Sequence, residues 1–514
     1  MSRTSGRALR AALAGAAVLL MAGCSGALGG GSGGAGTDTD TLTLGLSRQL
    51  TSLDPGSSGS IDGDATVQGA IFSSLTKIGP DQKLVGDLAT SWRQDSDVQW
   101  TFVLRDGVKF SNGDPLDAAT VKWNFDRLLD PTTKLTSGPA LRAIIARVDA
   151  PDAHTVVVTT KKPYLDLDER LSTTTFTEQK WVESHNPVLE PLGSGPYQLQ
   201  SVDLENGATL VRNPNYYGDK PYYDKVAFKV LGTEAARVQA LQSGSVDAAI
   251  QLDPQSLTQF AGSDRYTTGS QWSSWNMTLR INETKPPLQD PRVRQALNYA
   301  IDKKTIASSL LGPDIQPSSG QVLNAPYDQV NPDLQAYPHD PAKARQLLAE
   351  AGYPNGLDLE LALSTGTYIA SDPIAQAIAQ QLGEVGIRIK VTTAQFPSWV
   401  QRSYTDDVAD LIYIGYSSGY RAPAERLRIY TSTYSQSHFS DPAYDALVDQ
   451  LTTATSREQQ TDLLDRATQE FHDNPHVVFL WPQPLTWAVN KNLDWVPRPE
   501  HWLLPQDFRP KNAD

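Results

Sequence analysis

Hydrophobic and polar residues alternate with a period of two in the first half of the chain. Residues 42–46 place a leucine at every second position, and residues 100–104 do the same with Trp100, Phe102 and Leu104. Alternation of this kind is typical of half-buried strands. The β-branched run at 155–159 predicts a further strand.

Between these predicted strands, the apolar residues recur with the period of a helix. Val121, Phe125 and Leu128 fall on one helical face. The segment from about 95 to 190 therefore combines strands and helices.

In the second half of the chain, Asp-Pro pairs recur and mark the expected starts of helices. Aspartate caps free helical amides, and proline fits the first turn because its missing N–H would have no partner there. The pairs predict four helices, which begin at Asp290, Asp340, Asp372 and Asp441. Predicted strands at 387–391 and 411–414 follow in alternation with the helices, which indicates βαβ units and a mainly parallel sheet. The fold class predicted is α/β.

The N-terminal segment resembles a bacterial lipoprotein signal. Arginines at 3, 7 and 10 precede an apolar run at 11–20, and small residues lead to Cys24, the one cysteine of the chain. The apolar run is too short to span a bilayer stably. We expect residues 1–23 to be a signal peptide and Cys24 to receive lipid. The alternative is an ordinary signal peptide with an incidental cysteine.

A glycine-rich stretch follows Cys24. Residues 25–36 contain seven glycines and no charge, so 24–41 is expected to be a flexible tether that spans about 20–25 Å. The mature protein would be extracytoplasmic and held at the outer face of the cell membrane by lipid alone.

Length and charge limit the possible functions. The roughly 490 residues after the signal are enough for two or three domains. The chain has a net charge of −14, and because the first 23 residues carry three arginines and no carboxylate, the remainder has a net charge of about −17. An acidic protein of this kind is not expected to bind nucleic acid.

The sequence predicts no metal or cofactor. His472 and His476 have the spacing of a helical zinc pair, but Pro475 interrupts the helix that this spacing requires. The chain has neither a phosphate-binding loop of the Walker type nor a glycine-rich dinucleotide fingerprint after a strand.

Ligands of open α/β sheets bind at the carboxyl ends of strands. Two loops there, 364–368 and 415–421, are rich in hydroxyl and aromatic groups, which suit a small solute. Polar surface loops are the alternative. The second loop also fits G-x-S-x-G at 415–419, so a secreted serine hydrolase that uses Ser417, with Asp441 or Asp465 and His472 or His476, is a further hypothesis.

Several longer motifs occur together in a fixed order. They are KLVGDLATSW at 83–92, TFVLRDGVKFSNG at 101–113, GSGPY at 193–197, RNPNYY at 212–217, Asn282 with KPP at 285–287, RVRQALNYAID at 292–302 and DPAKARQLLAEAGY at 340–353. With them the chain resembles the extracytoplasmic solute-binding proteins of family 5, the peptide, opine and nickel group that feeds ATP-binding-cassette (ABC) importers. The resemblance covers nearly the whole mature chain.

The resemblance implies a two-lobed periplasmic-binding-protein-like fold of type II, similar to cluster C, with an extra subdomain on lobe I. Lobe I would comprise 40–272 with the subdomain near 59–189, lobe II would comprise 273–481, and 482–514 would return to lobe I. It also implies a monomer without catalytic activity that passes a peptide or peptide-like solute to ABC permease subunits. A receptor or chaperone-like lipoprotein that works without a transporter is a third hypothesis.

The chain departs from the family pattern in both loops. Peptide-binding members carry an acidic residue in the loop that matches 416–423, and Gly419 stands about where it falls; dipeptide binders carry an arginine in the loop that matches 364–368, which here is STGTY. Because a buried unpaired ammonium or carboxylate would cost several kcal/mol, we expect a ligand other than the usual dipeptide. Arg421 would suit an anionic ligand, or it is simply exposed.

The expected ligand contacts come from both lobes. They are Tyr416, Ser417, Ser418, Gly419, Tyr420 and Arg421 in the main loop, Ser364 and Tyr368 opposite, and Phe396, Trp275 and Phe72.

Overall fold

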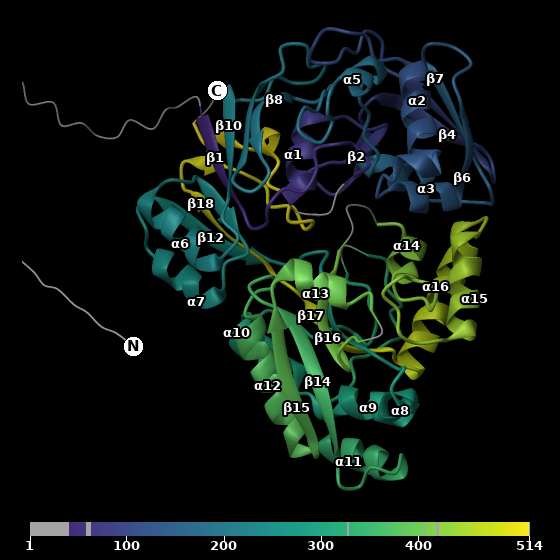
Figure 1. Ribbon diagram of the computed structural model, residues 1–514, viewed down its shortest axis with the longest axis vertical. Coiled ribbons are helices and arrows are strands. Elements are labelled where there is room, and N and C mark those ends of the chain that lie inside the picture. Colours follow the sequence, from purple (N-terminus) through teal and green to yellow (C-terminus); the bar gives the residue numbers. More distant parts are fainter. Residues whose placement is uncertain (1–40, 58–62, 326–327, 406, 418–420, 513–514) are drawn as a thin grey trace, which may run out of the picture. The chain divides into compact units, whose positions relative to one another are not determined.

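The structure is a computed structural model that describes residues 41–57, 63–325, 328–405, 407–417 and 421–512. Three sheets of four or more strands and two short hairpin-like pairs organise these residues (Figure 1). Within the described ranges, no helix combines the length and the apolar character needed to cross a bilayer.

A seven-stranded mixed sheet forms the centre of what we call the first lobe. Its strands, in spatial order, are β12 (Tyr266–Gln271), β18 (Leu485–Asn490), β11 (Ala248–Ile250), β1 (Thr41–Leu46), β10 (Lys225–Val230), β9 (Gly207–Arg212) and β8 (Tyr197–Asp203). β1 is the predicted first strand, and its three alternating leucines are buried. It runs parallel to both of its neighbours, β10 and β11. The helices of this lobe are α1 (Gly63–Ile71), α6 (Glu234–Ser243) and α7 (Pro254–Leu257).

A four-stranded antiparallel sheet lies in the subdomain. Its order is β4 (Ala89–Ser96), β5 (Gln99–Leu104), β7 (Thr155–Thr160) and β6 (Ile145–Asp149). The predicted strands at 100–104 and 155–159 are confirmed as β5 and β7. The subdomain also contains α2 (Ala118–Leu129), α3 (Gly138–Ile144), α4 (Leu167–Arg170) and α5 (Gln179–Ser184). α2 buries Val121, Phe125 and Leu128, as the helical period predicts.

A five-stranded sheet forms the centre of the second lobe. Its order is β15 (Ile387–Ala394), β14 (Leu357–Ser364), β16 (Leu411–Tyr416), β13 (Asn276–Ile281) and β17 (Val477–Pro482). Helices surround it (Figure 1): α8 (Pro286–Gln289), α9 (Pro291–Ala300), α10 (Lys303–Leu310), α11 (Pro341–Glu350), α12 (Ser371–Glu384), α13 (Phe396–Arg402), α14 (Pro423–Arg428), α15 (Pro442–Thr452) and α16 (Arg457–Asp473).

The remaining elements are short. They are the strand pairs β2 (Thr76–Ile78) with β3 (Leu84–Gly86) and β19 (Leu493–Asp494) with β20 (Arg509–Pro510), and the 3-10 turns Pro131–Thr133, Leu171–Thr173, Thr258–Phe260 and Pro505–Asp507. The boundaries of the lobes and the subdomain remain predictions from the resemblance.

The four helices predicted from Asp-Pro pairs are all present, and the aspartate caps three of them. Asp290, Asp340 and Asp441 cap α9, α11 and α15, and each carboxylate accepts a backbone amide of the first turn. Asp372, by contrast, lies inside the first turn of α12. Ala370 takes a left-handed conformation (φ 51°) and donates its amide to the Asp253 carboxylate of the first lobe, so the helix begins before the Asp-Pro pair.

The five-stranded sheet is mainly parallel, as predicted, and β13 is the exception. β14 is parallel to β15 and β16, but β13 is antiparallel to β16 and β17. The chain enters this sheet from the first lobe through β13 and returns there through β17. One of the two strands must therefore point away from the first lobe, and β13 is that strand.

The predicted strand 411–414 is also two residues too short. β16 continues to Tyr416, so Gly415 and Tyr416 belong to the sheet rather than to the loop that follows. This change moves the Tyr416 side chain away from the expected loop site.

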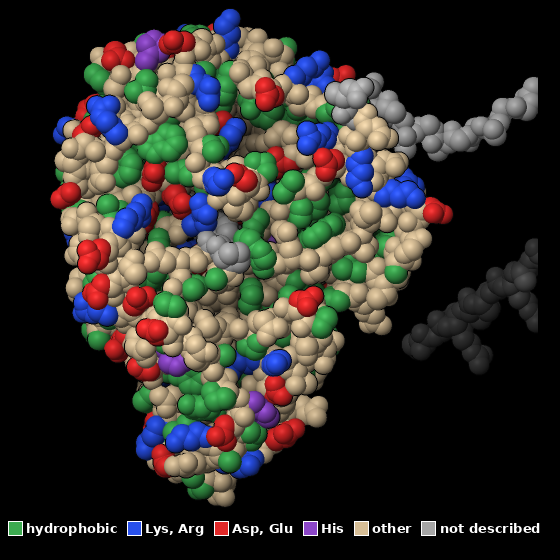
Figure 2. All heavy atoms as spheres, turned by 180° about the vertical axis from the view of Figure 1, so that it is seen from behind, with side chains coloured by type: hydrophobic (Ala, Val, Ile, Leu, Met, Phe, Trp, Pro, Cys, Tyr) green, Lys and Arg blue, Asp and Glu red, His purple; other side chains and the backbone are tan. Residues whose placement is uncertain are grey.

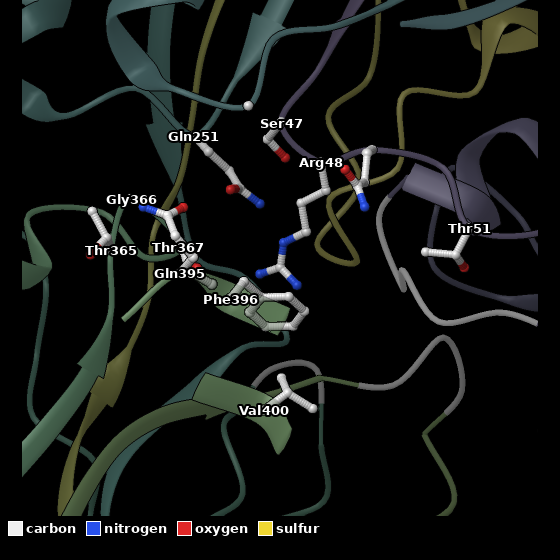
Figure 3. Close-up of a pocket in the computed structure, with 12 residues that line it drawn as sticks. Ser47, Arg48, Thr51, Gln251, Thr365, Gly366, Thr367, Gln395, Phe396 and Val400 are labelled. Carbon is white, nitrogen blue, oxygen red and sulfur yellow. The ribbon is translucent and has the colours of Figure 1, made fainter. Parts of the chain in front are cut away.

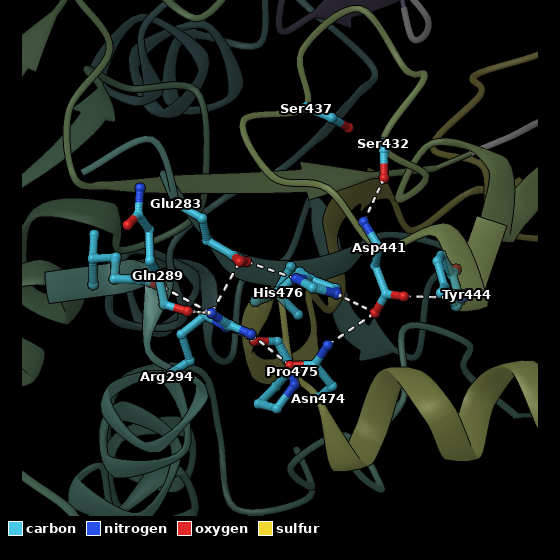
Figure 4. Close-up of polar contacts among 12 residues, drawn as sticks. Glu283, Gln289, Arg294, Ser432, Ser437, Asp441, Tyr444, Asn474, Pro475 and His476 are labelled. Carbon is cyan, nitrogen blue, oxygen red and sulfur yellow. Dashed lines mark hydrogen bonds and ion pairs between the residues drawn. The ribbon is translucent and has the colours of Figure 1, made fainter. Parts of the chain in front are cut away.

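A buried ion network ties the helices of the second lobe to β17 (Figure 4). His476 is 1% exposed, and its ring nitrogens contact Glu283 (Nδ1–Oε1, 2.6 Å) and Asp441 (Nε2–Oδ2, 2.9 Å). Arg294, 3% exposed, binds the other oxygen of Glu283 at 2.9 Å. The Asp441 carboxylate thus caps α15 and pairs with His476.

The electrostatics of the network follow from these contacts. Burial alone would lower the pKa of His476, but the hydrogen bonds that its ring donates to Asp441 and Glu283 outweigh burial and raise that pKa. The bond to His476 lowers the pKa of Asp441 to about 2. Charged His476 therefore stabilises the folded chain.

We predict that His476→Gln lowers the free energy of unfolding by about 3 kcal/mol near pH 6, because it leaves the buried Asp441 carboxylate without its cation, while Glu283 keeps Arg294. The folded pKa of His476 lies above the unfolded value, so its contribution is complete below pH of about 6.5 and is lost as pH rises through the folded pKa. Urea unfolding at pH 6, 7.5 and 9 should show the variant approaching the wild type as pH rises. His154→Gln, at an exposed histidine paired with Asp106, is the control. A constant difference at all three pH values would contradict this prediction.

Candidate functional site

A cavity of about 410 Å³ lies between segments of the first and second lobes (Figure 3). Residues of the first lobe on its wall are Ser47, Arg48, Gln49, Thr51, Gly232 and Gln251. Those of the second lobe are Thr365, Gly366, Thr367, Gln395, Phe396 and Val400. Its volume falls at the lower end of the range for small-molecule sites.

The wall is built from the residues that follow the carboxyl ends of strands. Ser47 and Arg48 follow β1, Gln251 follows β11, the 365–367 loop follows β14, and Gln395 follows β15. This position is the one at which open α/β sheets bind ligands. The backbone thereby gathers hydroxyl and amide groups around one space.

Arg48 extends from the first lobe into the cavity (Figure 3). Its guanidinium carbon lies 4.9 Å from the ring centroid of Phe396 and 5.2 Å from that of Trp275, both of which belong to the second lobe. Aromatic faces attract a guanidinium group electrostatically. Arg48 thus contacts the opposite lobe through two rings.

Strained backbone lies beside the cavity. Gln251 and His501 both have a left-handed φ, 59° and 68°, which is costly for residues with a Cβ. The Gln251 Nε2 and His501 Nδ1 atoms are 3.1 Å apart, and the His501 ring stacks on Trp275 at 5.5 Å. The C-terminal segment therefore supports the wall from behind.

A smaller cavity of about 160 Å³ adjoins the first and shares Gln251, Gly366 and Thr367 with it. Asp253 and Glu234 line this second space. Burial, followed by the charge of Glu234, raises the pKa of Asp253 to about 6. The Asp253 carboxylate accepts the Ala370 amide at 2.9 Å, which is a contact between the lobes.

Ionic contacts, which we call the latch, join the subdomain to the second lobe away from the cavity. The Asp166 carboxylate accepts hydrogen bonds from Arg457 and, at 2.6 Å, from Gln460 Nε2. Glu169 accepts both the backbone amide and the guanidinium of Arg421, each at 3.1 Å. The described residues therefore form a structure in which the lobes touch.

Among the predicted ligand contacts, Phe396 lines the cavity. Three others stand behind the wall. Ser364 is buried and shares a 2.6 Å hydroxyl contact with Thr367, Trp275 is 2% exposed beneath Arg48, and Tyr368 packs edge-on against Trp275. These residues position the wall rather than form it.

Other predicted contacts lie elsewhere. The Tyr416 hydroxyl donates to Gln436 inside the second lobe, and Arg421 pairs with Glu169 in the latch instead of standing exposed. Phe72 lines a separate cavity of about 240 Å³ in the first lobe. Ser418, Gly419, Tyr420 and Cys24 lie outside the described residues.

Sequence reasoning missed Arg48 and Gln251. The rule that singled out the loops after 359–363 and 411–414 applies equally to the predicted strand at 42–46, which Arg48 follows by two residues. Gln251 gave no such signal, because β11 has only three residues and was not predicted.

Ser417 does not contact a histidine. Its hydroxyl lies 2.5 Å from that of Ser274, while His476 engages Glu283 and Asp441 with both ring nitrogens. His472 contacts the Gly320 carbonyl through Nδ1. This arrangement does not supply the base that a serine nucleophile requires. The part of the chain that the structure describes also gathers no set of three or more His, Cys, Asp or Glu side chains suited to a metal ion.

Positive and negative side chains are interspersed over the face in Figure 2, where the described atoms form no continuous basic stripe. A stripe of that kind is the usual electrostatic footprint of a nucleic-acid site. The face therefore offers no support for such a site.

Known proteins resemble this chain in sequence and in structure. The glutathione-binding protein GsiB of Pectobacterium atrosepticum is 28% identical over 474 residues, which cover 88% of this chain and 90% of that protein. The periplasmic binding protein DppA from Helicobacter pylori, solved in complex with peptide STSA, has a TM-score of 0.81 at 18% identity and covers 92% of this chain and 98% of its own. AgaA from A. tumefaciens R10, solved with agropinic acid, has a TM-score of 0.80 at 25% identity, over 92% of this chain and 99% of its own.

These likenesses confirm the two-lobed α/β fold of the periplasmic binding proteins. The model of the bacterial extracellular solute-binding proteins, family 5 Middle, matches residues 83–438, more than two thirds of the chain. The chain therefore belongs to family 5 of the bacterial extracellular solute-binding proteins, which are binding proteins of ABC importers and not enzymes.

Proposed function

We propose that this protein is a monomeric, lipid-anchored binding protein that captures a small peptide-like solute between its lobes and delivers it to an ABC permease. The observation that carries the proposal is the cavity of about 410 Å³, whose wall comes from both lobes. A solute held there contacts both lobes only when they are together. It therefore favours the closed state by its differential affinity.

The contacts between the lobes support this mechanism. The latch and the Asp253–Ala370 bond lie outside the larger cavity and do not need a solute. In the latch, Arg457 is exposed although Asp166 is buried, and Arg421 and Glu169 are partly buried. Ion pairs that water reaches contribute about 0–1 kcal/mol each. Contacts of this strength assist closure, but they are too weak to keep the lobes closed without a solute.

The relatives and the cavity wall together support a peptide-like or amino-acid-derived solute. One relative is named for glutathione, and two structures hold a tetrapeptide and agropinic acid. Residues 416, 417 and 421–423 carry no carboxylate, so the loop offers no acidic partner there for a peptide ammonium group. We therefore propose a solute other than the usual dipeptide.

The anchor is proposed from the sequence alone. A basic start, an apolar run and Cys24 precede the glycine-rich tether, and lipid on Cys24 would keep the binding lobes near their permease.

Filling the cavity tests the binding function. We predict that Val400→Trp abolishes the rise in melting temperature that glutathione, a tetrapeptide or an opine acid causes in the wild type, because the larger side chain occupies the space. Val85→Trp, at an exposed position of β3, should behave like the wild type. Native mass spectrometry of protein purified from its own cells should also detect one solute per chain. Failure of both assays to detect any bound solute would contradict the proposal.

Weakening the latch tests closure. We predict that Asp166→Asn lowers the affinity for whichever probe binds by about three- to tenfold, although Asp166 does not line the larger cavity. X-ray scattering should show a larger radius of gyration for the ligand-free variant. Asp149→Asn, at a half-exposed position of β6 in the same subdomain, is the control. If the affinity and the radius of gyration are both unchanged, the latch does not contribute to closure.

The anchor has its own test. We predict that Cys24→Ser abolishes incorporation of labelled fatty acid and releases the protein from the membrane fraction. A variant that still incorporates the label, or a wild type that never does, would remove lipidation from the proposal without affecting solute binding.

A further inference from the structure

Two carboxyl groups of the first lobe meet at a contact with the second lobe. Glu234 Oε1 accepts the Asp253 backbone amide at 2.6 Å, and the two side chains are hydrogen-bonded to each other. Asp253 Oδ1 also accepts the Ala370 amide of the second lobe at 2.9 Å. The same carboxyl group therefore contacts an acid of its own lobe and the backbone of the other.

We propose that closing the lobes takes up one proton, held between Asp253 and Glu234, so that the protein closes more readily and binds its solute more tightly in mildly acidic surroundings. This inference rests on the proposed function, because it concerns closure around a solute, and it adds a condition that regulates closure. Neither carboxyl group lines the larger cavity, so the proton acts on closure rather than on the solute.

The contact between the two carboxyl groups requires a proton, because ionised carboxylates can only accept hydrogen bonds. Burial, followed by the charge of Glu234, raises the pKa of Asp253 to about 6, so the proton is assigned to Asp253. Protonated Asp253 satisfies both neighbours, since its hydroxyl donates to Glu234 while its other oxygen accepts the Ala370 amide. Once the proton leaves, the bond to Ala370 remains, but two negative charges face each other.

The charged groups around the small cavity of about 160 Å³ make closure sensitive to this proton. Besides Glu234 and Asp253, they are Arg237 of α6 and Asp372 in the first turn of α12. The Arg237 guanidinium donates to two backbone carbonyls of its own lobe, each at 2.8 Å. With Asp253 ionised, the described wall therefore carries three carboxylates and one guanidinium. Enclosing that excess of negative charge away from water is unfavourable.

Closure supplies much of this environment. Residues 366–373 of the second lobe line the small cavity, opposite four residues of the first lobe. When the lobes separate, these residues and the Asp372 charge move away, and water reaches Asp253. Burial has the largest influence on the pKa of Asp253, and the opposing bond from Ala370 ranks below both burial and Glu234. The pKa of Asp253 is therefore higher in the closed state than in the open one.

The sign of the pH dependence follows from this difference. A group whose pKa rises on closure takes up a proton as the lobes close. The resulting stabilisation of the closed state is complete below the open-state pKa of Asp253, and it is lost as pH rises through about 6.

Asp253→Asn tests the inference, because the asparagine amide copies the protonated acid: its oxygen accepts from Ala370 and its nitrogen donates to Glu234. The variant and the wild type are compared at pH 5.0, 6.0 and 7.5, by X-ray scattering without solute and by calorimetry with glutathione, the tetrapeptide STSA and agropinic acid. We expect the two proteins to be similar at pH 5.0. At pH 7.5 the variant should have the smaller radius of gyration and bind about three- to tenfold more tightly. Asp264→Asn, the same substitution at an exposed position of the first lobe, should follow the wild type at every pH.

The outcomes separate this inference from the proposed function. If Asp253→Asn matches the wild type at pH 7.5 in both measurements, the proton plays no part in closure and the inference is overturned. A variant that is more open or binds more weakly at every pH also overturns it, because ionised Asp253 would then hold the lobes together. If none of the three probes binds, the scattering comparison decides. Failure to find any bound solute contradicts the proposed function, whereas the radius of the ligand-free chain is measured independently of a solute.

Discussion

Two chain crossings, hydrogen-bonded to each other, join the lobes of this protein. The chain leaves the first lobe after β12 to form β13, and it returns through β17 to β18. Where the crossings meet, Gln483 donates its amide to the Trp275 carbonyl at 2.9 Å, and the Ser273 hydroxyl donates to the Gln483 carbonyl at 2.5 Å. Because both connections lie side by side, relative motion of the lobes is limited to bending near this line. The binding cavity lies where this bending brings the two lobes together.

The crossing also supports the wall of the cavity directly. Trp275, at the first crossing, carries Arg48 and His501 against its ring. The Gln483 side chain, at the second crossing, accepts the Ile369 amide from the segment after β14. Bending at the crossing therefore moves the groups that hold Arg48 and the 365–367 loop, so the geometry of the site depends on how far the lobes are closed.

Local signals in the sequence predicted local structure, and the failures concern contacts distant in the chain. The caps at Asp290, Asp340 and Asp441 depend only on their own first turns. Asp372 does not cap α12, because the helix starts one residue earlier, next to Ala370, whose amide is bound by Asp253 more than a hundred residues before it. The direction of β13 depends on the return of the chain to the first lobe. Arg48 lies two residues after the predicted strand at 42–46, so the strand-end rule could have found it, but its contacts with Trp275 and Phe396, which are remote in sequence, gave no signal.

Arg421 takes part in contact between the lobes and does not line the larger cavity. Arg421 is satisfied by Glu169, so it contributes to contact between the lobes whether or not a solute is present. A latch much stronger than about 1 kcal/mol per pair would close the empty protein, and the closed state would no longer report the solute. Arg48, by contrast, reaches the cavity itself and lies against Phe396 and Trp275 of the second lobe. A weak latch therefore leaves closure of the lobes dependent on the solute.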